Sequence, residues 1–206
     1  VVNSNGVSEL LTRKIVLATG ARERSAKQVS IHGTRPKGIY TAGTVQHLVN
    51  IDGVMPTKKA VILGSGDIGL IMARRLTLEG CQVEGVYEIM PTVSGLSRNV
   101  QQCLNDFNIP LYLSKTVTRT FGKDRLEKVE IMDVDENLKP IEGTEQIIEC
   151  DTLILSVGLI PENELATSLG ITLDSHTKGA ICDLDFETNV DGIYTCGNTT
   201  HVNDLV

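Results

Sequence analysis

The chain has 206 residues and a formal charge of −7, with 41% hydrophobic and 22% charged side chains. This composition suits one folded domain or two small ones. The acidic balance disfavours binding to DNA or to anionic lipid, and no apolar run is long enough for a membrane span. No secretory leader is recognisable, and the odd number of cysteines then favours reduced thiols in the cytoplasm.

The first fifty residues predict a few short elements. The Asn5-Gly6 pair is typical of a hairpin turn between two short strands. The continuous apolar run 15–18, which stops near a glycine, predicts a strand buried on both faces of a parallel sheet. Residues 45–50 favour one or two helical turns.

The most distinctive pattern begins at Lys59. Residues 59–63 predict a buried strand, and the glycine-rich residues 64–69 predict a tight turn. A helix is expected over 70–78 and a second strand over 82–87. A strand, a crossover helix and a parallel strand form a right-handed unit of an α/β sheet.

The second half predicts a helix over 99–107, a strand over 111–113 and another buried apolar run over 151–158. Between them lie three short stretches of alternating polarity, typical of a β-meander: 117–121, 129–134 and 147–150. We therefore predict an α/β fold, with a Rossmann-like parallel sheet and a β-meander insert.

The turn Gly64-Ser65-Gly66-Asp67-Ile68-Gly69 has the spacing of a dinucleotide fingerprint, and it stands between a strand and a helix. Gly64 would permit the tight turn, Gly66 would let a pyrophosphate approach the backbone, and Gly69 would let the helix pack closely on the sheet. Free amides and the helix dipole would favour the phosphates. We expect Asp67 to face solvent or to cap the helix, without a catalytic role.

Glu88 follows the second predicted strand, nineteen residues after Gly69. A carboxylate at that place can accept hydrogen bonds from both hydroxyls of the adenosine ribose. It would repel a 2′-phosphate, and no arginine follows it directly. The sequence therefore favours NAD over NADP.

No catalytic or metal-binding group is predicted. The four histidines are scattered, and no Cys-x-x-Cys spacing supports a dithiol pair or a zinc site. His201 with Asp204 is the one pair near a motif that deserves a check in the structure. Hydride transfer needs no protein acid or base, because the cofactors carry the chemistry.

Four motifs, taken in order, resemble the FAD/NAD-dependent pyridine nucleotide oxidoreductases: Ala18-Thr19-Gly20, the turn 64–69, Gly158-Leu-Ile-Pro161 and Gly192-Ile-Tyr-Thr-Cys-Gly197. Within that family, Arg22-Glu-Arg24 and Gly38-Ile-Tyr-Thr-Ala-Gly43 look similar to one branch. This branch holds the NAD(FAD)-dependent dehydrogenases associated with glycerol-3-phosphate or hydroxyacid dehydrogenases, and the α-subunits of sarcosine and opine oxidases.

The resemblance implies that residues 51–163 form an NAD-binding domain inserted between two parts of an FAD-binding domain, residues 1–50 and 164–206. It places Thr19, Gly20, Gly158 and Gly197 among the cofactor-binding residues. Asn198 stands where the family usually has an aspartate that binds FAD, and an amide can hydrogen-bond but carries no charge.

The family's glycine fingerprint for FAD is missing, and we expect it before Val1. FAD is therefore expected in the full-length protein rather than in this chain alone.

The expected function is hydride transfer between a nicotinamide and FAD, in the service of a partner dehydrogenase or oxidase subunit. A homo-oligomer is also possible on this resemblance. An NAD-binding or sensing module without catalysis is the alternative. A disulfide reductase is a third reading, which the missing Cys-x-x-Cys disfavours.

Overall fold

The computed structural model describes residues 2–4 and 6–202, and the chain divides into two compact units. We call residues Glu23–Gly158 the central unit. The residues on either side of it, Val1–Arg22 and Leu159–Val206, form the discontinuous unit.

A five-stranded parallel sheet forms the middle of the central unit. Its strand order is β6-β13-β7-β8-β9, so β7 lies between β13 and β8. The strands are β6 (Ile39–Thr41), β7 (Lys59–Leu63), β8 (Gln82–Tyr87), β9 (Leu111–Tyr112) and β13 (Thr152–Leu155). This confirms the predicted α/β fold class with a parallel sheet.

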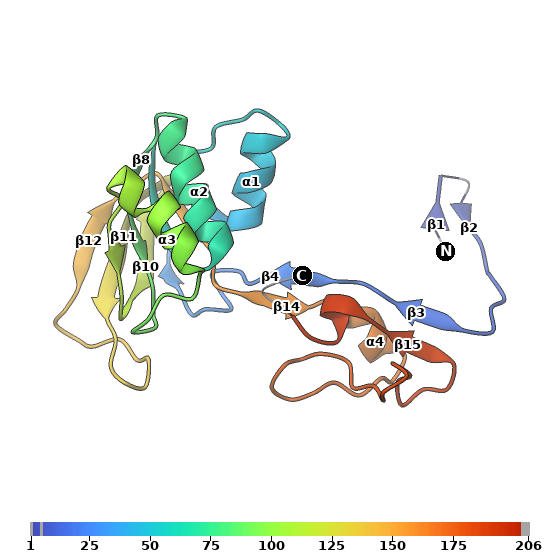
Figure 1. Cartoon of the computed structure of the whole chain (residues 1–206). Coiled ribbons are helices and arrows are strands. Elements are labelled where there is room, and N and C mark those ends of the chain that lie inside the picture. The colour runs from blue at the N-terminus through green and yellow to red at the C-terminus, as the bar shows by residue number, and fades with distance from the viewer. Residues whose placement is uncertain (1, 5, 203–206) are drawn as a thin grey trace. The chain divides into compact units, whose positions relative to one another are not determined.

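Side chains of β7 alternate between two cores, which explains why its sequence is apolar from Ala60 to Leu63. Ala60 and Ile62 pack against the helices α1 (Ala42–Asn50), α2 (Asp67–Leu78) and α3 (Ser97–Cys103). Val61 and Leu63 face the opposite layer. Figure 1 shows α1 and α2 side by side, away from β10–β12. No helix of the described residues is long and apolar enough to cross a membrane.

The opposite layer is the predicted β-meander. β10 (Lys115–Gly122), β11 (Leu126–Asp133) and β12 (Gln146–Glu149) pair antiparallel in that order. The short strand β5 (His32–Gly33) joins the far edge, in parallel with β10. Val117, Val129 and Ile131 pack from this layer against the parallel sheet. The meander prediction is therefore confirmed, with strand ends that differ by one to three residues.

Residues 23–50 pack with the central unit, although the predicted boundary lay at residue 50. β6 pairs in parallel with β13, and the buried Ala42, Val45 and Val49 of α1 belong to the helix-side core. Thr41 caps α1 through its hydroxyl, which accepts from the Thr44 amide at 3.4 Å. This cap starts the helix at Ala42 rather than at Val45.

The discontinuous unit contains three strand pairs. β1 (Val2–Asn3) and β2 (Gly6–Val7) form the predicted hairpin, although Asn5 of its turn lies outside the described residues. β4 (Ala21–Glu23) pairs with β14 (Leu159–Pro161), and β3 (Ile15–Leu17) pairs with β15 (Ile193–Thr195). The short helix α4 (Glu164–Ser168) and the 3-10 turn η2 (Gly197–Thr199) complete this unit.

The prediction that residues 15–18 are buried on both faces is wrong. Leu17 lies in a small core with Ala166 and Ile193, but Ile15 and Val16 are 40% and 63% exposed. In the part of the chain that the structure describes, β3 has one neighbouring strand, β15, and is not the inner strand of a larger parallel sheet.

Asp151 connects the starts of β7 and β13. One of its carboxylate oxygens accepts from the Thr57 hydroxyl at 2.7 Å, and the other accepts from the Lys58 amide at 2.9 Å. Partial burial alone would raise the pKa of this carboxyl, but the hydrogen bonds outweigh the burial and lower the pKa below its usual value.

We expect Asp151→Asn to lower the free energy of unfolding at pH 7 by about 1 to 3 kcal/mol, because the amide cannot accept both hydrogen bonds. Since the folded-state pKa is depressed, the wild-type advantage is present above about pH 4 and is lost as the pH falls through the folded-state pKa. Urea unfolding measured from pH 7 to pH 2 checks this. A difference between the two proteins that does not change with pH would contradict it.

Candidate functional site

The glycine turn follows β7 at the carboxyl edge of the sheet. Leu63, the last residue of β7, pairs with Leu155 on one side and Tyr87 on the other. Gly64 then turns the chain at φ +97°, and its amide donates to the Tyr87 carbonyl at 2.7 Å. The turn therefore lies at the ends of three parallel strands, where open α/β sheets bind their ligands.

Two of the three glycines are needed by the protein itself. A Cβ at residue 64 would lie 2.0 Å from the Ser156 carbonyl oxygen, and the positive φ adds strain. A Cβ at residue 69 would lie 2.8 Å from the Ser156 Cβ. Gly64 and Gly69 thus permit the turn and the close approach of α2 to the end of β13.

Gly66 differs from the other two. Its φ is −64°, and a Cβ there would meet the Ser156 Oγ at 3.4 Å, an ordinary contact. Among the described residues, no acceptor bonds the amides of Gly66, Asp67 or Ile68. Three amides at the positive end of α2 are therefore available to an anion, next to a residue whose missing side chain leaves room for one.

Glu88 is turned toward the glycine turn and is only 5% exposed. Its Oε2 accepts from the amide of Ser65 at 2.8 Å and from the Ser65 hydroxyl at 2.5 Å. Its Oε1 accepts from the Met90 amide at 3.0 Å. Both carboxylate oxygens of Glu88 therefore already accept hydrogen bonds within the protein. No cationic side chain pairs with it in the described residues.

Asp67 is half-buried and does not cap its own helix. Its Oδ1 accepts from the Leu96 amide at 2.9 Å and from the Asn99 Nδ2 at 2.7 Å. Asn99 is buried, with 9% exposure. Asp67 therefore joins the glycine turn to the start of α3, an arrangement that depends on residues about thirty positions away and has no local signal.

The other predicted residues of this unit have lesser contacts. Ile68 is 42% exposed. Gly158 is exposed at φ +91°, and its carbonyl accepts from the Arg24 amide at 3.2 Å. Sequence reasoning missed Ser156, whose Oγ accepts from the Gly69 amide at 3.1 Å. Its place directly after a buried parallel strand was the available signal.

In the discontinuous unit, Thr199 brings the predicted flavin residues together. Its buried hydroxyl accepts from the Gly20 amide at 3.2 Å and lies 3.3 Å from the Thr19 hydroxyl. Gly197 begins the same 3-10 turn at φ +68°, and the half-buried Asn198 follows it. The motifs near residues 20 and 197 are thus adjacent, through a residue that the sequence analysis did not single out. Asp204, the predicted partner of His201, lies outside the described residues.

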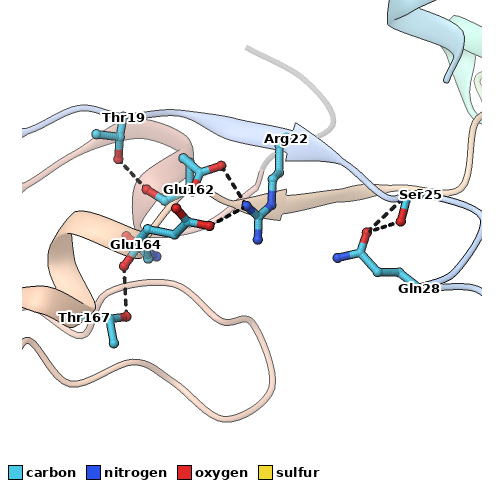
Figure 2. A network of polar contacts seen from close by, with 8 residues as sticks. Thr19, Arg22, Ser25, Gln28, Glu162, Glu164 and Thr167 are labelled. Carbon is cyan, nitrogen blue, oxygen red and sulfur yellow. Dashed lines mark hydrogen bonds and ion pairs between the residues drawn. The ribbon is translucent and has the colours of Figure 1, made fainter.

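A polar network supports this cluster (Figure 2). The Thr19 hydroxyl donates to the Glu162 carbonyl at 2.5 Å, and the Glu162 amide donates to the Gly20 carbonyl at 2.9 Å. The Arg22 guanidinium donates to Glu164 at 2.9 Å and lies 3.4 Å from the Glu162 carboxylate. These contacts hold residues 162–164 beside Thr19-Gly20.

All five cysteines are free thiols. Burial raises the pKa of the thiols of Cys81, Cys103 and Cys150, for Cys150 to about 12. Thiolate is the reactive form, so burial lowers the reactivity of these three thiols. The buried cysteines thus behave as small core residues.

The comparison with family models now decides the assignment, since the pyridine nucleotide-disulphide oxidoreductase model matches residues 1–205. The chain belongs to this family. The family uses FAD and NAD(P)H, in agreement with the predicted cofactors.

Three individual relatives illustrate the range of the family. The chain is 29% identical, over 93% of its length, to the CoA-dependent NAD(P)H sulfur oxidoreductase of Pyrococcus abyssi. It is 28% identical, over 76% of its length, to the hydrogen cyanide synthase subunit HcnB of Pseudomonas aeruginosa. The NAD-dependent persulfide reductase of A. fulgidus superposes on 97% of the chain, with a TM-score of 0.72 and 25% identity.

The chain spans 41%, 36% and 36% of the lengths of these three proteins, respectively. None of the three is named as a glycerol-3-phosphate, sarcosine or opine enzyme. The finer branch suggested by the sequence therefore has no support from them and stays a prediction.

Proposed function

We propose that the central unit binds NAD(H), with the pyrophosphate at the amino end of α2. The observation that carries this is the combination at Gly66: three free amides, and a glycine that the unliganded protein does not need. The remainder of the turn is held rigidly by Ser156, Tyr87 and Glu88. A prearranged turn reduces the ordering cost of binding.

We propose further that Thr19, Gly20, Gly197 and Asn198 contribute to an FAD site in the full-length protein. Thr199 and the Arg22 network hold the two segments together, so this half of a site is already formed. FAD would accept a hydride from the nicotinamide when bound. The protein's residues orient the cofactors and exclude water, and no side chain near the glycine turn is required as an acid or base.

NAD is preferred over NADP in this proposal for an electrostatic reason. Glu88 is a buried carboxylate that pairs with no cationic side chain among residues 2–4 and 6–202, and the first cationic side chain after it is the exposed Arg98. A 2′-phosphate at the adenosine ribose would meet this negative charge.

The proposal also covers what packs against the discontinuous unit. Several apolar side chains of the discontinuous unit are exposed, among them Leu11, Val16 and Leu184. We propose that β3 packs against the part of the protein that the longer relatives possess. The sequence resemblance is the basis for proposing a partner dehydrogenase or oxidase subunit and the branch named above. The odd number of cysteines is the basis for proposing a cytoplasmic location.

The test is anaerobic addition of NADH to the full-length protein, with the visible absorbance of the flavin as readout. We expect a yellow protein that NADH bleaches faster than NADPH does. A colourless protein that binds NADH without oxidising it would favour the NAD-sensing alternative. A protein that binds neither nucleotide would contradict the proposal.

A further inference from the structure

We propose that Asp67 is a positioning residue that holds residues 94–99 against the glycine turn as the adenosine-side wall of the nucleotide site. Its charge at the same time weakens the grip of that turn on phosphate. This inference rests on the proposed NAD(H) site and concerns how that site is held together. It assigns a role to a side chain that the proposed function left unused.

The position of the wall follows from the sheet order. β8 is the neighbour of β7 and ends at Tyr87, directly before Glu88. In this fold class the acid at the end of the second strand marks the ribose of the adenosine half. Residues 94–99 continue from that strand end, so they lie on the adenosine side of the turn.

Five hydrogen bonds join this wall to two residues of the turn, one of them between the hydroxyls of Ser65 and Ser94 at 3.1 Å. Asp67 Oδ1 accepts from Leu96 and Asn99. The Ser65 hydroxyl accepts from the Ser94 amide at 2.9 Å, and the Ser65 carbonyl accepts from the Gly95 amide at 2.9 Å. Asp67 supplies the only negative charge among these acceptors, and charge-assisted bonds are the stronger ones.

The wall lies so close that residue 95 must be glycine. A Cβ there would lie 2.7 Å from the Ser65 carbonyl oxygen and 2.9 Å from Asp67 Oδ1. The φ of Gly95 is not in the left-handed region, so steric space alone requires glycine. An alanine at this position would push the wall away from the turn without straining its own backbone.

The charge of Asp67 opposes the ligand. The residue lies in the first turn of α2, beside the amides that we assign to the pyrophosphate. A carboxylate there competes for the positive end of the helix dipole. Removing the charge while keeping the acceptor should therefore strengthen nucleotide binding, whereas removing the acceptor should loosen the wall.

The test compares Asp67→Asn, Asp67→Ala and the control Glu79→Gln in the 206-residue chain, with Kd measured by calorimetry for NADH and for ADP-ribose. Glu79→Gln removes one negative charge at the opposite end of the same helix, where Glu79 pairs with Arg75. ADP-ribose contains the adenosine half and the pyrophosphate without the nicotinamide.

We expect Asp67→Asn to bind both probes about threefold more tightly than wild type at low salt, and the gain should shrink as salt is added. Asp67→Ala should bind both about tenfold more weakly than Asp67→Asn, because only the asparagine keeps the acceptor. Glu79→Gln should match wild type. Amide exchange at Leu96 should be faster in Asp67→Ala alone.

Gly95→Ala keeps the charge of Asp67 and should weaken the binding of both probes about tenfold. This variant therefore distinguishes the effect of the wall's position from the effect of the charge. Equal affinity of Asp67→Ala and Asp67→Asn would overturn the positioning role, and so would normal affinity of Gly95→Ala. If wild type binds NADH and ADP-ribose but Asp67→Asn gains nothing at low salt, the charge argument is overturned. If wild type binds neither probe, the proposed function fails together with this inference.

Discussion

Gly66→Val is expected to abolish NADH binding while leaving the fold intact. A Cβ at residue 66 makes only an ordinary contact with Ser156, and the backbone φ of −64° suits any residue. The added methyl groups would instead occupy the space beside the free amides that we assign to the pyrophosphate. We expect at least a hundredfold rise in Kd, measured by calorimetry, with an unfolding midpoint close to that of wild type.

Gly64→Ala is the matched control, and it should disturb the fold itself. Residue 64 has a positive φ, and its Cβ would lie 2.0 Å from the carbonyl oxygen of Ser156. This variant should be strongly destabilised, since both the clash and the backbone strain must be relieved. If Gly66→Val bound NADH as wild type does, the phosphate position assigned here would be wrong.

Glu88→Ala is expected to reduce both stability and nucleotide affinity. The substitution leaves the buried amide and hydroxyl of Ser65, and the part-buried amide of Met90, without this acceptor. Unsatisfied buried donors of this kind should lower the free energy of unfolding by about 2 to 4 kcal/mol. Because Ser65 is part of the turn, its loosening should also raise the Kd for NADH by about tenfold or more.

Glu149→Ala is the control, since it removes an exposed carboxylate from β12. It should change neither the free energy of unfolding nor the Kd for NADH. Affinities of Glu88→Ala for NADH and NADPH should be measured together. The account expects NADH to lose more, because the carboxylate favours ribose hydroxyls and repels a 2′-phosphate. An equal loss for both nucleotides would remove the basis for the NAD preference.

The fold of the central unit was largely readable because its strands are apolar on both faces. β7 and β8 were predicted at their observed limits, since the apolar run of β7 ends at Gly64 and β8 ends before the acid Glu88. β6 was not foreseen, because three residues with half-buried side chains give no periodic signal. The burial of β3 was overestimated, since a sequence cannot show whether a strand has neighbours.

The site could be predicted only as far as local geometry determines it. The different steric reasons for Gly64, Gly66 and Gly69 could be predicted from the turn and the helix that follows it. The structure shows a distinct environment for each glycine. The orientations of Glu88 and Asp67 depend on partners 23 to 32 residues away, and Ser156 lies 87 residues from Gly69. Such tertiary hydrogen bonds leave no periodic pattern in a sequence.

The most direct test of the phosphate site is an amide NMR titration of the 206-residue chain with NADH. We expect the amides of Gly66, Asp67 and Ile68 to shift most, with a common Kd, and those of the β10–β12 meander to stay unchanged. Saturable shifts centred on any other part of the central unit, with these three amides unaffected, would contradict it.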